Sequence, residues 1–537
     1  MPLGEVRSGM QCTGLSVVRG TEISSFDVEV LDVIADDPAI GGPRLLIRVS
    51  GPAIDATGVG PGFSGSPILC DGRNAGAISE GIGEYGNKVV LATPIEEILT
   101  SRPQPTPTGA RRAPHVTRRA RPLLGPLSVG GLSPGASRLM ARAARRAGRV
   151  VLAAPPGPLG GYPPQDLQPG SAVGAAISSG DVSVGAIGTV AYRDGDEIFA
   201  FAHALDGLGE RALFLQDAYV FGVIGNPVGI PDFGAITYKL TSSGGHPLGT
   251  FTNDTQPGIA GRLGAGPPAI PLHVAARERG APGEAIALDS LLADERSLEL
   301  GAGISFIAPL AAGTALDRLL RTFEPVTLTA CTRFRIGGRD KPIGFCNPYF
   351  DPFDALTDIA DASAMVDGFD FAPLDIRAVG VSIAAERGVV DEVLAEARAP
   401  RRVQAGARIP VRIRLLRRGG GRRTVTVRVR VPRNLRPGER TLVLEGNGFG
   451  NEFDFLIELI AGELNGPVTA KGAQARSAQT GPRTVSRLAR RLKRMRRPLG
   501  ITARFRKRDE PKVVLRSNDV RFDGRVKVSL RVRRARR

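Results

Sequence analysis

The 537-residue chain contains no tryptophan, and aromatic residues make up only 5% of it. Proteins that bind carbohydrates or single-stranded nucleic acids by stacking need several exposed aromatic rings. The composition therefore argues against both kinds of binding. Histidine is also scarce, with four residues, and the four cysteines do not have the spacing of metal ligands. The sequence thus implies no metal ion and no cofactor.

Long apolar runs are missing as well: no segment is long enough to span a membrane, and none has the pattern of a signal peptide. Cysteine is rare but even in number. Cys12, Cys70, Cys331 and Cys346 permit two disulfides, in three pairings that the sequence does not distinguish. The simplest pairing joins Cys12 to Cys70 and Cys331 to Cys346. Free thiols in a cytoplasmic protein are the alternative.

Acidic residues are scarce at one end of the chain only. The net charge is +18, and residues 483–537 hold 22 Lys/Arg against 4 Asp/Glu, which accounts for the whole excess. Such clusters attract nucleic acids, anionic lipids or acidic polymers. No helix-turn-helix, zinc-finger or RNA-binding motif accompanies the charge, so we expect no specific nucleic-acid partner. We favour a solvated basic strand face, and electrostatic contact with anionic surface polymers is the alternative.

The length allows about three domains with cores of their own. Glycine and proline are abundant, valine- and threonine-rich runs recur, and long amphipathic helices are few, so we predict a mainly β protein. Residues 376–381, 409–414 and 424–431 alternate between apolar and other side chains, a pattern typical of an immunoglobulin-like β-sandwich. The parts without a candidate site are predicted as a Pro/Arg-rich linker with a short helix over 101–171, a connecting segment over 326–374, the sandwich over 375–480, and basic strands or a tail over 481–537.

Residues 62–67 read Gly-Phe-Ser-Gly-Ser-Pro, a pattern with which many serine peptidases present their nucleophile. Glycines on both sides of a serine permit a sharp turn that directs backbone amides inward. Ser64 is therefore the candidate nucleophile, and the N–H groups of Gly62 and Ser64 are the candidate oxyanion-hole donors. Ser66 ranks second, because it lies beyond the turn and would more naturally hydrogen-bond the loop. An ordinary turn between strands is the alternative.

A β-hairpin is expected directly after this motif, because apolar residues at 67–70 and 75–78 flank a tight-turn signal. A strand at 89–94 and a helix at 95–99 follow. Nucleophile, hairpin, strand and closing helix form the layout of a chymotrypsin-like C-terminal barrel. Five segments of the chain resemble the SpoIVB peptidase family of sporulation-signalling serine peptidases. They are the motif itself, Gly-Met at 9–10, Arg-Gly-Thr at 19–21, Phe-Asp-Val-Glu-Val-Leu at 26–31 and Gly-Ala-Ile at 76–78.

The resemblance implies a chymotrypsin-like double β-barrel that uses Ser, His and Asp, so one histidine should act as general base. His203 is the candidate, because a strand at 185–192, a turn at 194–196 and a second strand from 198 precede it, as in the family's base-bearing segment. Imidazole suits this role near neutral pH. A buried histidine on a strand is the alternative. We expect a serine half-barrel over 1–100 and a histidine half-barrel over 172–325, permuted relative to the family's order.

The other histidines have less suitable surroundings. His115 lies in the Pro/Arg-rich linker, and His246 follows a Ser-Gly turn. His273 sits among apolar residues, so a packed side chain is expected there.

The acid of the triad has no clear counterpart. The family leads us to expect an aspartate shortly before the nucleophile, but Gly51 stands there. Asp55 is the nearest carboxylate and is the acid that we predict, reaching the same place from a shifted loop. Asp206 is a second option, although its short spacing from His203 suits a turn better. The acid fixes the histidine tautomer and stabilises the imidazolium, so its loss would lower the rate and leave the mechanism intact.

These residues together predict a serine endopeptidase that cleaves a protein or peptide substrate through an acyl-enzyme. In that mechanism Ser64 is the nucleophile and His203 is first general base and then general acid. The alternative is a non-catalytic binding or scaffold protein at the cell surface, which keeps the double barrel and has lost the acid. The resemblance leads us to expect an extracytoplasmic location, which two disulfides would suit.

Overall fold

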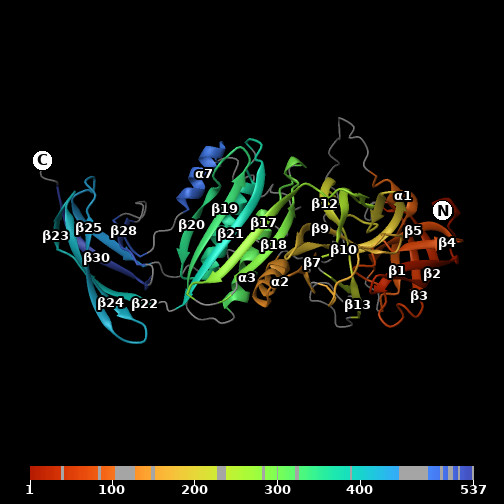
Figure 1. Ribbon diagram of the computed structural model, residues 1–537, viewed down its shortest axis with the longest axis horizontal. Helices are drawn as coiled ribbons and strands as arrows, with labels where there is room; N and C mark the ends of the chain where they lie inside the picture. The colour runs from red at the N-terminus through yellow and green to blue at the C-terminus, as the bar shows by residue number, and fades with distance from the viewer. Residues whose placement is uncertain are drawn as a thin grey trace.

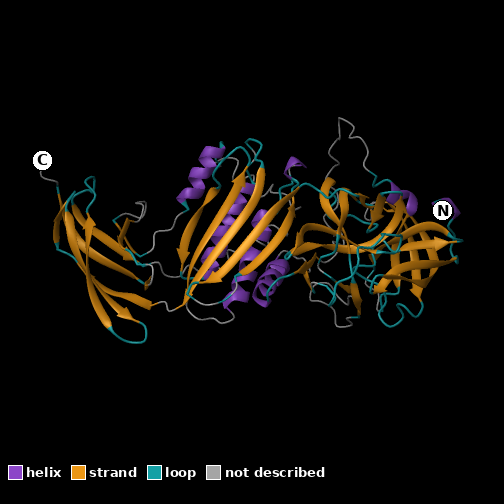
Figure 2. Cartoon of the chain, viewed as in Figure 1, coloured by secondary structure: helices purple, strands orange, loops and turns teal. Residues whose placement is uncertain are grey.

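The computed structural model shows a mainly β protein with 53% strand and 15% helix, as the sequence predicts. Two barrels, a central sheet and a C-terminal sandwich follow one another along the long axis in chain order (Figure 1). Most of the helical residues lie against the central sheet (Figure 2). The structure describes residues 1–37, 42–82, 86–102, 127–146, 151–155, 157–225, 237–242, 244–280, 283, 285–298, 300–320, 326–369, 371–387, 390–446, 482–495, 500–505, 512–517 and 520–534.

The first barrel is closed by six strands in the order β1-β2-β3-β6-β5-β4. Alternation along the strands directs Val28, Ile47 and Ile68 into its interior, where they are fully buried. A disulfide joins Cys12 on β1 to Cys70 on the paired strand β4. The elements are η1 (Leu3–Glu5), β1 (Gln11–Arg19), β2 (Glu22–Asp37), β3 (Gly42–Ser50), β4 (Pro67–Cys70), β5 (Arg73–Gly81), β6 (Val89–Pro94) and α1 (Ile95–Leu99), so the predicted hairpin, strand and helix after the Gly-x-Ser-Gly motif are confirmed.

A second barrel is closed by six further strands in the order β9-β10-β11-β16-β15-β12, because β12 also pairs with β9. Phe201, Leu213 and Phe251 are buried in its core. The double barrel predicted from the sequence is therefore present. The strands are β9 (Ala172–Gly180), β10 (Ser183–Asp194), β11 (Glu197–Ala200), β12 (Gly209–Asp217), β15 (Pro247–Thr255) and β16 (Gly258–Leu263).

The two barrels share one topology. If the strands of each barrel are numbered along the chain, both rings run first-second-third-sixth-fifth-fourth. Ser64 lies in the connection between the third and fourth strands of the first barrel, and His203 lies in the same connection of the second. The two candidate residues thus occupy topologically equivalent loops.

A hairpin inserted in the second barrel reaches the first one. It consists of β13 (Val220–Ile224) and β14 (Tyr238–Thr241), which pair antiparallel. An isolated bridge joins Val220 to Gly20 at the end of β1. The hairpin therefore places Lys239, on β14, close to the junction of the two barrels.

The central sheet continues from the second barrel through β18, which pairs with β9. Helices α3 and α4 pack against this sheet, and Leu310, Leu328 and Ile359 belong to the shared core. Helix α2 joins the same core, and β7 and β8 extend the sheet beyond β10. The elements are β7 (Leu127–Gly130), α2 (Pro134–Arg146), β8 (Val151–Ala154), β17 (Ala269–Glu278), β18 (Ile286–Ala293), η2 (Arg296–Leu298), α3 (Ile304–Leu320), β19 (Val326–Ile336), β20 (Ile343–Tyr349), α4 (Pro352–Asp367) and β21 (Ile376–Arg387).

The domain boundaries predicted over this region need correction. The second barrel ends with β16, so β17, β18 and α3 belong to the central sheet and not to a half-barrel that extends to residue 325. The connecting segment 326–374 is part of the same module. β21 pairs parallel with β17 and antiparallel with β19, so the sandwich does not begin at residue 375. Alternation alone identified β21 as a strand but did not reveal its partners.

The C-terminal sandwich has a sheet of order β25-β24-β22-β29 and a second of order β23-β30-β26-β27-β28. The last strands belong to it, so 481–537 is not a separate basic tail. Helix α7 (Val485–Arg494) instead returns to the central module, where Leu488 and Leu492 are fully buried. The strands are β22 (Val390–Arg398), β23 (Arg402–Gln404), β24 (Arg408–Arg417), β25 (Arg422–Arg430), β26 (Gly438–Glu445), β27 (Ile501–Arg504), β28 (Lys512–Leu515), β29 (Val520–Asp523) and β30 (Arg525–Arg533).

A second disulfide lies in the central sheet, where Cys331 on β19 is bonded to Cys346 on β20. Both bonds of the simplest predicted pairing are therefore present. No helix within the described part of the chain combines the length and apolar character needed to cross a membrane.

Candidate functional site

The loop that carries Ser64 is shaped by glycine and by its own hydrogen bonds. Gly62 and Gly65 have φ values of +96° and +93°, a region that favours glycine. The N–H of Phe63 donates to the carbonyl oxygen of Gly60 (2.9 Å), and the N–H of Gly65 donates to that of Ile78 on β5 (2.7 Å). The loop thus bonds to itself before the serine and is anchored to β5 of its own barrel after it.

The donors between these anchors remain available. The N–H groups of Gly62 and Ser64 donate to no group within the described residues, and neither does the Ser64 hydroxyl. Ser64 is half-buried, whereas Ser66 is fully buried and its hydroxyl bonds that of Ser16 (2.8 Å). The geometry therefore leaves the two predicted oxyanion donors unoccupied, and it gives Ser66 the structural bond that the sequence suggested.

The serine loop packs directly against the second barrel. Thr189 on β10 donates its N–H to the carbonyl oxygen of Ser64 and its hydroxyl to that of Gly62, both at 2.8 Å. A Cβ atom on Gly65 would lie 1.9 Å from the carbonyl oxygen of Thr189 and 2.7 Å from the nitrogen of Phe201. Only glycine fits this contact. Because Phe201 is two residues before His203, the two equivalent loops meet here.

The histidine loop leaves β11 through two strained residues. Phe201 and Ala202 have φ values of +67° and +53°, which residues other than glycine rarely adopt. Thr93 on β6 of the first barrel holds this turn by donating its hydroxyl to the carbonyl oxygen of Ala202 (2.8 Å). The turn brings His203 back to the junction of the two barrels.

The His203 ring is oriented by the backbone of the next residue. Its Nδ1 lies 2.7 Å from the carbonyl oxygen of Ala204, and because a carbonyl only accepts, Nδ1 carries the proton. Nε2 is then the ring's free acceptor, as a general base requires. Burial lowers the pKa of His203 below its usual range, although the Ala204 bond and the nearby Glu80 and Asp254 carboxylates oppose this shift. Burial therefore favours the neutral form of the His203 ring.

No hydrogen bond joins Ser64 to His203 within the described residues, and the histidine is only 8% exposed. In structures without substrate, catalytic hydrogen bonds are often long or poorly aligned. The arrangement brings the two loops into contact without completing a proton path between the two side chains.

The predicted acid Asp55 lies elsewhere. Its side chain is 51% exposed and accepts a hydrogen bond from Lys88 (3.0 Å), which lowers the pKa of the carboxyl. No described hydrogen bond links it to His203. The second option, Asp206, accepts from Arg211 (3.2 Å) and does not bond His203 either. The role of Asp55 as triad acid stays a prediction, and the geometry gives it no support.

Sequence reasoning missed Asp254, which lies at the end of β15. It is fully buried and accepts hydrogen bonds from the N–H groups of Leu205 (2.8 Å), Asp206 (2.7 Å) and Gly207 (2.9 Å). Burial raises its pKa, and these bonds oppose the shift. Asp254 therefore holds the loop that follows His203. Its place after Asn253, just before a tight turn, was the available signal.

The remaining histidines fall into three cases. His246 bonds the buried carboxylate of Asp217 through Nδ1 (2.9 Å), but no described interaction links it to Ser64. His273 is exposed on β17 and bonds Asp289 (2.6 Å), which corrects the predicted packed side chain: its apolar neighbours face the core and it faces outward. His115 lies outside the described residues.

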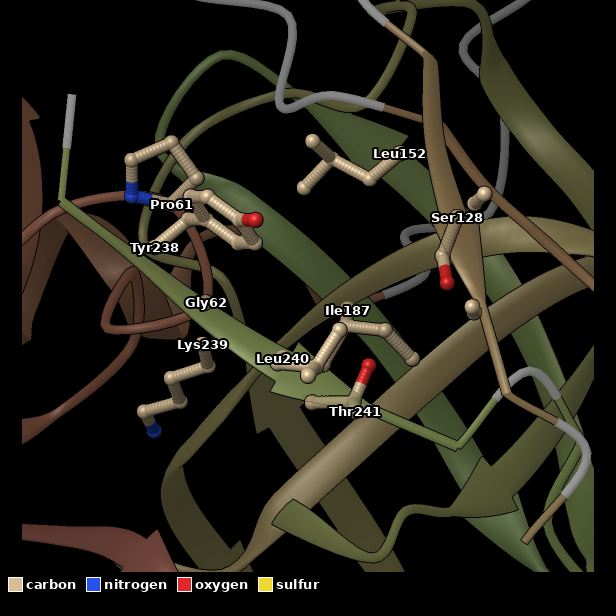
Figure 3. A pocket seen from close by; sticks show the side chains of 11 residues that line it. Pro61, Gly62, Ser128, Leu152, Ile187, Tyr238, Lys239, Leu240 and Thr241 are labelled. Carbon is tan, nitrogen blue, oxygen red and sulfur yellow. The ribbon is translucent and has the colours of Figure 1, made fainter. Parts of the chain in front are cut away.

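A pocket begins beside the serine loop, lined by Pro61 and Gly62 (Figure 3). Most of its other side chains are apolar, and the polar exceptions are Ser128, Lys239 and Thr241. Figure 3 shows the Lys239 side chain turned away from that of Tyr238. The apolar side chains that line the pocket are those of Leu152, Ala153, Ala154, Ile187, Tyr238 and Leu240.

Among the described residues, no cluster of three or more His, Cys, Asp or Glu side chains is arranged to hold a metal ion. Comparison with known proteins gave no match: no family model, no curated protein and no solved structure matches this chain. The resemblance to the SpoIVB peptidase family therefore stays a prediction.

Proposed function

We propose that the protein is a serine endopeptidase that acts on a protein or peptide substrate. The observation that carries the proposal is the meeting of two equivalent loops. One has Ser64 and two N–H groups without a partner among the described residues, and the other has His203, whose Nε2 is an acceptor in the neutral ring. A nucleophile, a base and a pair of oxyanion donors are the parts that acyl transfer needs.

In the proposed mechanism Ser64 Oγ attacks the scissile carbonyl carbon while Nε2 of His203 takes the hydroxyl proton. The N–H groups of Gly62 and Ser64 donate to the oxyanion that forms. His203 then returns the proton to the leaving amine as the C–N bond breaks. Water, deprotonated by the same nitrogen, hydrolyses the ester and restores the serine. The Ala204 carbonyl fixes the histidine tautomer, a task that a carboxylate performs in other triads.

The pocket next to the loop supports a substrate preference. Pro61 and Gly62 line it and lie just before the nucleophile in the chain, so a residue bound at the oxyanion donors would direct a neighbouring side chain toward it. Because its other side chains are mainly apolar, we expect cleavage beside an apolar residue such as Leu or Phe.

The test is labelling of the full-length protein with a fluorophosphonate probe, followed by mass spectrometry. We expect an adduct on Ser64 that is lost in S64A and kept in S529A, which alters an exposed serine of β30. Both variants should retain the circular dichroism spectrum of the wild type. A folded wild-type protein that forms no adduct would overturn the proposal.

A non-catalytic scaffold is the second candidate. It is favoured by the missing carboxylate at His203 Nδ1 and by the missing bond between Ser64 and His203 among the described residues. The labelling experiment separates the two candidates, because a scaffold needs no activated serine.

A further inference from the structure

We propose that Lys239 is a positioning residue for the nucleophile loop: its side chain and backbone hold residues 61–64 in the shape that leaves the Gly62 and Ser64 amides free. The functional part of this inference rests on the proposed function. The contacts that carry it are independent of any chemistry at Ser64.

The Lys239 ammonium lies under the loop with an unusual set of partners. Its Nζ donates to the hydroxyl of Ser16 on β1 (2.7 Å) and to that of Thr189 on β10 (3.1 Å). The same nitrogen lies 4.5 Å from the centre of the Phe63 ring, a cation–π contact with the residue that precedes the nucleophile. One side chain therefore connects both barrels to the Gly-x-Ser-Gly motif.

Backbone contacts continue the same connection. The N–H of Lys239 donates to the carbonyl oxygen of Pro61 (3.0 Å). A Cβ atom on Gly62 would lie 2.9 Å from the Cβ of Lys239, so the lysine chain packs against the glycine backbone. Thr189 links the ammonium to Gly62, because its hydroxyl accepts a hydrogen bond from Nζ and donates one to the carbonyl oxygen of Gly62 (2.8 Å). Residues 61, 62 and 63 are each held by Lys239 or by its partner.

The charge on Lys239 has no carboxylate to balance it among the described residues. The groups that contact its side chain among the described residues are Ser16 from β1, Thr189 from β10, and Gly62 and Phe63 from the loop, and none of these four is titratable. Lys239 is only 4% exposed, and burial lowers its pKa to about 7. The ammonium is therefore lost near neutral pH, and with it the cation–π contact to Phe63.

The first experiment measures hydrogen exchange, which needs no catalysis. We compare peptides covering residues 60–66 in the wild type, in K239M and in K527M, a control at an exposed lysine of β30. The protected amides are those of Phe63, Gly65 and Ser66. We expect K239M to exchange there at least about tenfold faster, a change of about 1.4 kcal/mol in local opening. Wild-type exchange in K239M would overturn the proposal, whatever the labelling of Ser64 shows.

The second experiment measures the rate of Ser64 phosphonylation against pH. The wild-type rate should fall above about pH 7 as Lys239 loses its proton. K239M should react about ten- to a hundredfold more slowly below pH 7 and should lack this alkaline decline. A K239M profile that matches the wild type would overturn the proposal. If the wild type itself is not labelled, the proposed function fails, and hydrogen exchange alone decides whether Lys239 holds the loop.

A second variant covers the case in which K239M does not fold. T189V removes the hydroxyl that links Nζ to the Gly62 carbonyl and keeps the shape of the side chain. We expect faster exchange at residues 60–66 and a slower phosphonylation rate in T189V. Unchanged values of both would overturn the proposal.

Discussion

The two barrels have the same strand order, yet their equivalent loops are built differently. The serine loop relies on glycines and leaves two N–H groups without a partner among the described residues, and its serine is half-buried. The histidine loop directs three N–H groups onto the buried carboxylate of Asp254, and its ring bonds its own backbone. One loop leaves two N–H groups unpaired among the described residues, whereas the other satisfies its polar groups internally. Under the proposed function, the first barrel would bind the substrate and the second would transfer the proton.

Removal of the base should have the largest effect. We expect H203Q to lower the phosphonylation rate of Ser64 about a thousandfold, because a neutral amide cannot accept the hydroxyl proton. The rate is followed by mass spectrometry, with circular dichroism as the check on folding. A rate within about twofold of the wild type would show that the second barrel does not supply the base.

The second largest effect is expected from a substitution that forces the serine and histidine loops apart. In G65A the new methyl group would meet Thr189 and Phe201 backbone atoms, so we expect a loss of more than about 3 kcal/mol in the free energy of unfolding by urea. G72A is the matched control, because Gly72 has φ +72° but a Cβ added to it would meet no atom within 4 Å, and it should lose only about 1 kcal/mol. Equal losses would contradict the close contact.

Replacement of the Asp254 carboxylate, which holds the histidine loop, should have a smaller effect. D254N keeps the volume but replaces one acceptor oxygen by a donor that faces backbone N–H groups. We expect a loss of about 2 kcal/mol in unfolding free energy and about a tenfold slower phosphonylation. The same substitution at Asp55 tests the sequence-based acid. A larger rate loss in D55N than in D254N would restore Asp55 as the partner of His203.

The smallest effect concerns pH and Lys239. In the folded protein the pKa of Lys239 is about 7, whereas an unfolded lysine keeps its proton to about pH 10.4. Between these values the unfolded state binds more protons, so stability rises with pH. Between about pH 7.5 and 8.5 we expect the wild type to gain about 1 kcal/mol relative to K239M, measured by urea unfolding in matched buffers. If the free energies of unfolding of the wild type and K239M changed with pH in parallel, the lysine would have to be exposed to solvent and the prediction would be wrong.

Local signals in the sequence predicted the parts of the site that depend on neighbouring residues. The glycines around Ser64, the hairpin after it and the strands before His203 are each determined by nearby residues in the chain, and the structure contains them. Cross-barrel contacts have no such signal. The sequence around Lys239 does not indicate that its ammonium lies under Phe63, because that contact depends on how two barrels and a hairpin pack.

The sequence did not predict the pairing partners of the strands either. β21 alternates as a sandwich strand would, but it lies between β17 and β19, and its buried side chains belong to the core that α3 and α4 cover. The strands rich in arginine after residue 500 were recognised as basic, and their pairing with β26 and β22 required the fold.

Helix α7 determines how the molecule responds to proteolytic cleavage of one peptide bond between the central module and the sandwich. The chain leaves the central module after β21, returns to it with α7, and leaves again toward β27, so it passes between the two modules three times. A single cut between β21 and β22 would leave a C-terminal fragment whose Leu488 and Leu492 still fill the other fragment's core. The cleaved protein would therefore run as one species under native conditions and as two under denaturing ones.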